Sequence, residues 1–267
     1  MRLDDCVESV YSGPHNTTDR GSPYLFMKIA LITAMPEESR AVIRRVKSFK
    51  ERLPGNRKSY RIRLAAHEVT LLEAGMGLLN AGWAASALAV EKPDLMISTG
   101  FGGAVLAGLR VGDAVMAEQV LQWNGSGFED VAVGFYGRNA LAETLAIHRG
   151  SFITSDVILN KRSTARILPP GTANPVLEME SSAVARVAAA HGIPFLALRV
   201  ISDPWYEEFG FDIKEFCDDS MRIRPAKVFN VIVRRPRIIP QLIRLALNSR
   251  IASFSLARVM KRLFLQI

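Results

Sequence analysis

The chain has 267 residues, 49% hydrophobic and 22% charged, which is the composition of a globular protein with a large core and excludes wholesale disorder. The formal net charge is +8, but residues 222–267 hold 11 Lys or Arg and no Asp or Glu, which leaves 34 − 11 = 23 basic against 26 acidic residues, or −3, for the rest. The basic character therefore belongs to the C-terminal segment, and we expect no nucleic-acid partner for the body. The chain has only two cysteines, which make no disulfide framework and favour a cytoplasmic protein.

Residues 1–26 are polar and lack the apolar centre of a secretory signal peptide. We expect them to be a disordered extension, with Met27 as an alternative start of the chain. No run of about 18 apolar residues occurs, so no transmembrane helix is predicted.

The folded body begins at the apolar run Lys28–Ala34, which has the pattern of a strand buried in a parallel sheet. Pro36 and two acidic residues then begin a predicted helix that runs to about Phe49. The segments Tyr60–Leu64 and Val69–Glu73 predict a hairpin.

An Ala-rich helix is expected next, over about 80–90, followed by a strand at Asp94–Ser98. This strand ends in the glycine-rich stretch Thr99–Gly103. Glycines directly after a strand allow a ligand to approach the backbone, although a tight turn explains them equally well.

Strands and helices continue to alternate through a strand ending near Val120, a helix over Ala140–His148 and a strand over Ser151–Asp156. This order predicts an α/β fold in one domain over residues 27–221. We expect a three-layer α/β/α sandwich around a mixed, mostly parallel central sheet.

The segment 222–267 differs because apolar residues recur in it at roughly helical spacing between arginines. It predicts a basic amphipathic helical tail. The tail either packs on the domain or on a partner subunit, or it contacts anionic lipid as a peripheral membrane element. Contact with nucleic acid is the third alternative for this segment.

The stretch Val176–Pro204 holds the charged residues that are hardest to explain structurally. Glu178 and Glu180 precede a small-residue helix, and an apolar strand then ends at Arg199 and Asp203. Burying a carboxylate costs free energy, so a buried carboxylate indicates a functional role. Ligands gather at the carboxyl ends of parallel strands. The strand ends carry neither His and Cys at metal-ligand spacing nor a Gly-x-Ser-x-Gly motif, so we expect no metal, no cofactor and no serine-hydrolase site.

Three segments together resemble the purine-nucleoside phosphorylase and nucleosidase superfamily. They are K-I-A-L-I-T-A-M-P-E-E at Lys28–Glu38, P-D-L-M-I-S-T-G-F-G-G-A-V-L-A-G-L-R-V-G-D at Pro93–Asp113, and Val176–Asp203 with its M-E-S and R-V-I-S-D motifs. The pattern is most similar to the methylthioadenosine/S-adenosylhomocysteine nucleosidases. The resemblance implies a nucleoside phosphorylase-like fold, a nucleoside substrate and a homo-oligomer.

The resemblance also implies roles for particular residues. Asp203 matches the general acid that protonates the purine N7, and Ser202 orients it. Glu180 matches the carboxylate that binds the ribose hydroxyls, and Met179 packs under the sugar.

Glu38 matches the residue that positions the attacking water, with Glu37 as the alternative, and Arg199 is expected beside that water. The other positions expected to contact substrate are Met35, Gly100, Phe101, Gly102, Ile158 and Leu159.

Two positions depart from the nucleosidase pattern and make the expected site more apolar. Phe101 stands where a small polar residue is common, and Ile158 replaces an aromatic residue that stacks on the purine. The loop after the first strand is acidic and lacks a glycine–arginine phosphate cradle, which favours water over phosphate as nucleophile. Arg40 and Arg199 leave phosphorolysis open as the alternative.

The C-terminal half, with V-I-V-R-R-P-R-I-I-P-Q-L-I-R-L-A after the R-V-I-S-D-P strand end, resembles the hopanoid-associated members of the superfamily. That resemblance implies removal of adenine from adenosylhopane. A lipid-tailed nucleoside agrees with four aromatic residues expected beside the site: Trp205, Tyr206, Phe209 and Phe211.

The expected function is therefore acid-assisted hydrolysis of the N-glycosidic bond of a 5′-substituted adenine nucleoside. A protonated acid at the base, a carboxylate near the sugar and an activated water suit an oxocarbenium-like transition state. A phosphorylase is one alternative, and a non-catalytic nucleoside-binding or membrane-interaction protein on the same fold is another.

Overall fold

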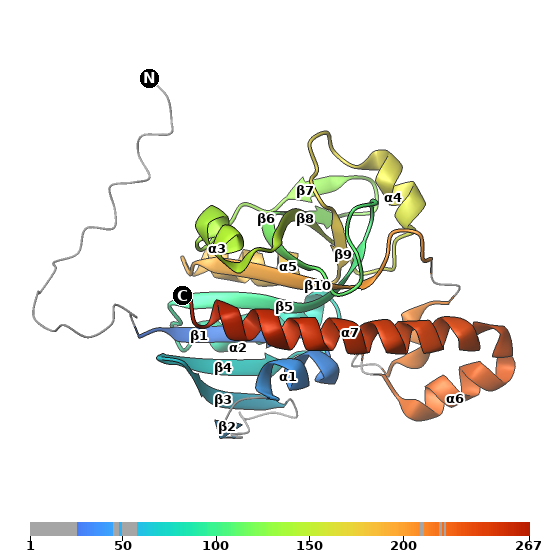
Figure 1. The fold of residues 1–267 in the computed structure, drawn as a ribbon, viewed down its shortest axis with the longest axis horizontal. Helices are drawn as coiled ribbons and strands as arrows, with labels where there is room; N and C mark the ends of the chain where they lie inside the picture. Colours follow the sequence, from blue (N-terminus) through green and yellow to red (C-terminus); the bar gives the residue numbers. More distant parts are fainter. Residues whose placement is uncertain (1–25, 45–47, 50–57, 209–210, 219–220, 222) are drawn as a thin grey trace, which may run out of the picture.

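The computed structural model describes residues 26–44, 48–49, 58–208, 211–218, 221 and 223–267, so the extension expected before Phe26 lies outside the described residues. The described chain forms a mixed sheet with helices on both faces, which confirms the predicted fold class (Figure 1). Its elements are β1 (Lys28–Thr33), α1 (Pro36–Ile43), β2 (Ser48–Phe49), β3 (Ser59–Leu64), β4 (His67–Glu73), α2 (Leu78–Ala89), β5 (Leu95–Ala104), β6 (Ala114–Trp123), β7 (Phe128–Asp130), α3 (Arg138–Leu145), β8 (His148–Thr154), α4 (Lys161–Ile167), β9 (Val176–Glu178), α5 (Ser181–Ala190), β10 (Phe195–Asp203), η2 (Ile213–Phe216), α6 (Pro225–Arg234), η3 (Pro236–Ile238) and α7 (Ile239–Leu263).

The strands pair in the order β10-β6-β8-β9-β5-β1-β4-β3-β2, with β7 beside β6. Because β10 also pairs with β5, the strands β5, β10, β6, β8 and β9 close into a ring (Figure 1). Parallel pairs join β4, β1, β5 and β10 at the centre, whereas β3–β4, β10–β6 and β5–β9 are antiparallel. The carboxyl ends of β1, β5 and β10 therefore lie at one edge, where ligands gather in sheets of this kind.

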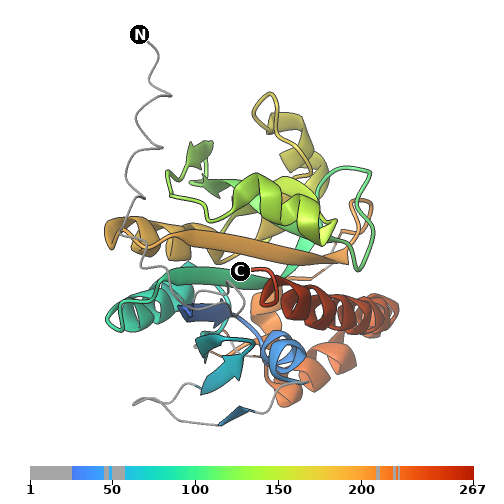
Figure 2. The same ribbon diagram turned by 60° about the vertical axis from the view of Figure 1, so that its left-hand side comes forward.

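Alternate residues of β1 face two separate cores. Ala30 and Ile32 pack with small residues of α2 and α5, and Ile29 and Leu31 pack with residues of α1 and α7. A strand that is buried on both faces needs apolar residues at successive positions, which explains the unbroken run in its sequence. Figure 2 shows α2 on one side of the sheet and α1 and α7 on the other.

The two halves of the long helix α7 differ in what they pack against. Its C-terminal half packs on the domain through Leu256, Met260 and Leu263, all nearly inaccessible to solvent. Its N-terminal half extends with α6 beyond the sheet (Figure 1). Between α6 and α7 a small cluster forms around Phe211, Phe216 and Ile238.

Three predicted boundaries were wrong. The helix expected to end at His148 ends at Leu145, and His148 begins β8. The helix expected to reach Phe49 ends at Ile43, and Ser48–Phe49 instead pairs with β3 as a short strand. The strand expected to end at Ser98 continues as β5 to Ala104, so the glycine-rich stretch is part of the sheet and not a turn after it. The reason is that β10 pairs with this stretch as far as Gly103.

Within the described residues, no helix is both long enough and apolar enough to cross a membrane.

Candidate active site

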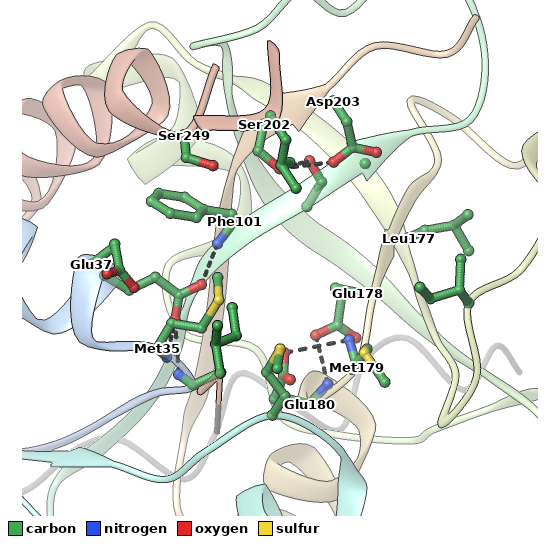
Figure 3. Close-up of a pocket in the computed structure, with 18 of the residues that line it drawn as sticks. Met35, Glu37, Phe101, Leu177, Glu178, Met179, Glu180, Ser202, Asp203 and Ser249 are labelled. Carbon is green, nitrogen blue, oxygen red and sulfur yellow. Dashed lines mark hydrogen bonds between the residues drawn. The ribbon is translucent and has the colours of Figure 1, made fainter. Parts of the chain in front are cut away.

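A cavity of about 1120 Å³ opens at the carboxyl ends of the central strands. Its walls come from the β1–α1 junction, the glycine-rich part of β5, the loop after β8, the β9–α5 junction, the end of β10, and α7. Figure 3 shows Ser202 and Asp203 on one side and Glu178 with Glu180 on another, and Glu37 lies on the side of Phe101. Segments more than 150 residues apart in sequence, such as Glu37 and Asp203, thus line one space.

Glu38 is fixed by backbone donors around its carboxylate. It is the third residue of α1, and its Oε2 accepts the N–H groups of Ala34 at 2.8 Å and Met35 at 2.9 Å. Its Oε1 accepts the N–H of Phe101 on β5 at 2.8 Å. These bonds tie α1 to β5 and hold a buried carboxylate at the cavity wall. Glu37, by contrast, pairs with Arg40 on an exposed surface of α1.

Glu178, which lines the cavity, forms a buried ion pair with Arg199 behind the wall. The Nη2 of Arg199 lies 2.5 Å from Oε2 of Glu178, and it also donates to Ser98 at 3.0 Å. The same Oε2 of Glu178 accepts the N–H groups of Glu180 at 3.0 Å and Ser181 at 2.8 Å, at the beginning of α5. A carboxylate at a helix N-terminus is favoured by the helix dipole and by the unpaired N–H groups there.

Glu180 occupies a position between this pair and the cavity. Its Oε1 accepts the N–H of Gly77 at 3.0 Å, and its Oε2 lies 3.5 Å from Nη2 of Arg199. We call Glu38, Glu178, Glu180 and Arg199 the carboxylate cluster. Three buried carboxylates face one guanidinium, so their protonation is coupled.

The carboxyl groups of the cluster differ in acidity. Burial raises the pKa of Glu180 to about 7, and the charge of Glu178 adds to the increase. Burial also raises the pKa of Glu38 above its ordinary value, in spite of the N–H of Phe101 and the charge of Arg199. Burial acts in the same direction on Glu178, but the charge of Arg199 and the hydrogen bond from Thr154 outweigh it and lower the pKa of that carboxyl. Glu178 is therefore the lasting ionic partner of Arg199, and Glu180 can exchange a proton near neutral pH.

The glycines of β5 allow these carboxylates to pack directly on the strand. A Cβ at Gly100 would collide with the carboxyl group of Glu38, and one at Gly103 would collide with Oδ2 of Asp203. A Cβ at Gly102 would meet the side chain of Val176 on β9. None of these three glycines needs positive φ, so close approach is what their positions require.

Asp203, at the end of β10, is held by two neighbours. The hydroxyl of Ser202 donates to its Oδ1 at 2.8 Å. The Nζ of Lys161, the first residue of α4, lies 2.5 Å from its Oδ2. Lys161 and Asp203 are both buried.

The comparisons with known proteins point in one direction. The family described as the Phosphorylase superfamily matches residues 28–233. The chain belongs to the phosphorylase superfamily.

Relatives within the superfamily include a 5′-methylthioadenosine/S-adenosylhomocysteine nucleosidase of Listeria monocytogenes, 30% identical over 223 residues that cover 71% of this chain and 92% of the Listeria protein. A nucleosidase of the same name from a Geobacillus species is 28% identical over 229 residues, covering 77% of this chain and 98% of that protein. The predicted family resemblance is thus confirmed.

Two solved structures share the superfamily fold. The Helicobacter pylori 5′-methylthioadenosine/S-adenosyl homocysteine nucleosidase superimposes with a TM-score of 0.66 at 16% identity, covering 90% of this chain and 98% of that one. The futalosine hydrolase of Helicobacter pylori gives the same TM-score, identity and coverage. At this identity the likeness shows the fold alone.

The structure brings most of the predicted site residues of this superfamily member to the cavity. The predicted residues that line it are Met35, Glu38, Phe101, Gly102, Ile158, Leu159, Met179, Glu180, Ser202 and Asp203. The two others, Gly100 and Arg199, lie behind the wall: Gly100 packs against Glu38, and Arg199 binds Glu178. The roles given to all of these residues remain predictions.

Only one of the described aromatic residues expected near the site lies at the cavity. Phe211 lines the cavity. Trp205 and Tyr206 are exposed and lie outside the lining, and Phe209 lies outside the described residues.

Two functional candidates were missed in the sequence. Lys161 begins a short helix that was not predicted after the loop of Ile158 and Leu159, and its partner Asp203 is 42 residues away. The face of α7 that lines the cavity, with Leu245, Ser249 and Ser253, was also not foreseen. Among the residues that the structure describes, no group of His, Cys, Asp and Glu is placed to hold a metal ion.

Proposed function

We propose that the protein cleaves the N-glycosidic bond of a 5′-substituted adenine nucleoside and releases adenine by hydrolysis. The observation that carries the proposal is the convergence of Glu38, Glu180 and Asp203 on one cavity, in a chain whose relatives are named as 5′-methylthioadenosine/S-adenosylhomocysteine nucleosidases. Three separate carboxyl groups suit a reaction in which charge develops on the base, the sugar and the nucleophile together.

In this proposal the purine lies beside Asp203, which transfers a proton to N7 as the bond to the sugar breaks. The sugar lies against Met179 and Glu180, whose carboxylate accepts hydrogen bonds from the ribose hydroxyls and offsets positive charge on the oxocarbenium-like sugar. The attacking water is held by Glu38 and gives it a proton. A base works best when its pKa lies near the working pH, and burial moves the pKa of Glu38 in that direction.

Hydrolysis is favoured over phosphorolysis by the charges around Glu38. A phosphate at that place would meet a cavity wall that already holds buried carboxylates. Nη2 of Arg199 is already bound to Glu178 and Ser98 and lies 3.5 Å from Glu180. Arg40 and Arg44, which line the cavity from α1, are the cations that favour the phosphorolytic alternative. Phosphorolysis is the alternative within the same proposal, and it predicts a rate that depends on phosphate.

The size of the cavity supports a bulky apolar 5′ substituent such as the hopane of adenosylhopane. Ligand pockets are usually about 300–1,000 Å³, and this cavity of about 1120 Å³ exceeds them. Beyond the carboxylates it continues between α1 and α7, where Ile43, Leu245, Ala246 and Phe211 line it. A lipid chain would find apolar walls there.

The exposed side of α6 and α7 supports contact with an anionic membrane. It carries Phe229 and Val233 on α6 and Ile239, Ile243 and Leu247 on α7, all exposed, and we call these residues with the arginines among them the C-terminal surface. Arg234, Arg237 and Arg250 make no ion pair with any described residue. Arginines beside exposed apolar side chains suit the boundary between lipid headgroups and acyl chains, and Arg250 also lines the cavity.

A homo-oligomer is the remaining part of the proposal. Leu79 and Trp83 lie one turn apart on α2 and are 91% and 47% exposed. Large apolar side chains exposed in this way are typical of protein interfaces.

The test is adenine release from methylthioadenosine, S-adenosylhomocysteine and adenosylhopane, each with and without phosphate. We expect phosphate-independent release by the wild-type protein and none by Asp203→Asn. Undiminished activity of that variant would contradict the mechanism. Binding of all three nucleosides without turnover would instead support a non-catalytic nucleoside-binding protein.

A further inference from the structure

Lys161 is a buried lysine that the reaction described above does not use. It is 4% exposed, although lysine is rarely buried unless it is paired. Its partner is Asp203, whose Oδ2 lies 2.5 Å from Nζ. A buried ion pair is poor evidence for stability, because removing two charges from water costs about as much as their attraction returns. Stability therefore does not explain the pair at the end of β10, and a role in the reaction is the explanation that we pursue.

The ammonium of Lys161 has no donor left for a ligand. It can donate three hydrogen bonds, and it has three acceptors: Oδ2 of Asp203, the carbonyl of Asp203 at 3.3 Å and the carbonyl of Pro204 at 2.7 Å. All three acceptors belong to the end of β10 and the residue after it. Lys161 consequently acts on a substrate through Asp203 and not by direct contact.

The local structure holds Lys161 in this place. Asn160 caps α4 by accepting the N–H of Ser163 at 2.9 Å. The carboxylate of Glu208 accepts the backbone N–H groups of Lys161 at 3.2 Å and Arg162 at 3.1 Å. The first turn of α4 is thus held by the side-chain cap from Asn160 and by the hydrogen bonds from its backbone to Glu208.

Glu208 is the charged residue that contacts α4 beside the pair. The other charged residues that line the same cavity are Glu37, Glu38, Arg40, Arg44, Glu178, Glu180, Glu207, Asp212 and Arg250. From β5 the neighbour is Gly103, which has no side chain: a Cβ there would collide with Asp203 and lie 3.2 Å from Cε of Lys161. Because Gly103 has no side chain, Lys161 and Asp203 can form their ion pair against β5.

We propose that Lys161 is a positioning residue that holds the carboxylate of Asp203 and supplies the proton that Asp203 passes to the base. The inference rests on the proposed function, because it assigns Asp203 that transfer. Nζ of Lys161 lies 2.5 Å from Oδ2 of Asp203, so a proton can pass directly between the two groups.

The proton balance of the step is complete. As the bond from the sugar C1′ to the purine N9 breaks, its electron pair goes to the purine, and N7 takes a proton from Asp203. Asp203 takes one from Nζ of Lys161, which becomes an amine. Water forms the new bond to C1′ and loses a proton to Glu38. Solvent returns a proton to Lys161 and removes one from Glu38 after the products leave.

Two substitutions separate proton supply from simple charge pairing. Lys161→Arg keeps a positive charge beside Asp203 but does not release a proton, whereas Lys161→Met removes both. We expect both variants to lower kcat for adenine release by about 10²–10⁴, the usual range for general acid catalysis, with KM little changed. A purely structural or electrostatic role predicts near-normal kcat for Lys161→Arg.

The pH profile gives a readout that a structural role does not move. Lys161→Cys treated with bromoethylamine gains an ammonium that is more acidic than that of lysine. We expect it to regain activity and to lose it on the alkaline side at a lower pH than the wild type. Wild-type protein treated in the same way controls for the modification, and Arg162→Met, at the next and exposed position of α4, controls for substitution in this helix.

The outcomes are distinct. Wild-type kcat in Lys161→Arg, or an unchanged alkaline limb in the aminoethylated variant, overturns the inference and leaves the proposed function intact. A wild-type protein that releases no adenine overturns the proposed function first, and the inference with it. Thermal melting and calorimetric binding of adenine show that each variant is folded; if Lys161→Arg does not fold, the aminoethylated variant decides the question.

Discussion

The carboxylate cluster and the C-terminal surface use charge in opposite ways. In the cluster, Glu178 and Arg199 are almost completely buried, and each charge has its partners within the protein. On the C-terminal surface, arginines such as Arg237 stand in solvent beside exposed apolar residues. Buried charges determine one another's protonation and position, whereas solvated charges act nearly independently. Substitutions in the carboxylate cluster should therefore have large, non-additive effects on stability and activity, whereas those on the C-terminal surface should have small, additive effects.

The largest effect is expected from Arg199→Met. It leaves the carboxylates of Glu178 and Glu180 buried without their cation, and breaking such a pair usually costs about 3–5 kcal/mol of unfolding free energy. Urea unfolding measures the loss. The double variant Glu178→Gln/Arg199→Met should recover a substantial part of it, and simple additivity of the two changes would show that the cluster is not coupled.

Gly100→Ala tests how closely the cluster is packed on β5. The added Cβ would collide with the carboxyl group of Glu38, and we expect kcat to fall by about 10²-fold, as for other small displacements of catalytic groups. The matched control is Gly82→Ala in α2, where the nearest atom, Cβ of Ala183, lies 3.7 Å away. That variant should keep its activity and gain about 0.5–1 kcal/mol of stability, since glycine is unfavourable within a helix. Equal activities of the two variants would argue against a close fit at Gly100.

The pH dependence of Glu180 tests the coupling from another side. Its pKa of about 7 lies above its ordinary value of 4.5, so the folded protein binds more protons than the unfolded chain between these pH values. Its contribution to stability is therefore present at low pH and is lost as the pH rises through about 7. In the proposed mechanism Glu180 binds the ribose as a carboxylate, which forms over the same range, so kcat/KM should rise toward pH 7 while stability falls. Glu180→Gln should lower activity and reduce both slopes by the part that Glu180 contributes, with Glu38, whose pKa is also raised by burial, accounting for a remainder. A wild-type profile in that variant would exclude Glu180 as a titrating group.

The smallest effect on stability is expected on the C-terminal surface. Changing Phe229 and Arg237 to Ser should alter the unfolding free energy by no more than about 0.5 kcal/mol, because neither side chain is buried. Sedimentation with vesicles of phosphatidylcholine and phosphatidylglycerol should nevertheless decrease, and release of adenine from methylthioadenosine should not. Val90→Ser, at the end of α2, is the control for general loss of an exposed apolar residue. Equal sedimentation of wild type and variant, or sedimentation independent of phosphatidylglycerol, would contradict membrane contact by this surface.

The alternating pattern of apolar strands and helices was sufficient to predict the fold class, because strands such as β1 are buried on both faces and read as continuous apolar runs. The end of β5 could not be predicted in the same way. Glycine is disfavoured in strands, and β5 extends through this stretch because it pairs there with β10, about 100 residues later, and with β9 at Gly103 and Ala104. Local propensity carries no information on such a partner.

The site likewise has residues that the local sequence predicts and residues that depend on distant parts of the chain. Glu38, Glu180 and Asp203 were expected together because each follows or ends a predicted strand, and the structure places all three at one cavity. Lys161 was not expected there, since it begins a short helix that the sequence pattern did not reveal. Its burial depends on Gly103 and Asp203, which come from other parts of the chain.

The position of α7 has a consequence for how the molecule is made. Leu256 and Met260 complete the core beside β10, and Ser249 and Ser253 close one wall of the cavity, so the earlier elements cannot reach their final packing without this helix. During synthesis the ribosome must release residues beyond Leu263 before the sheet is covered on that face. Until then the apolar face of β1, β5 and β10 is open to water, and this is the interval in which a chaperone or premature self-association would act on the nascent chain.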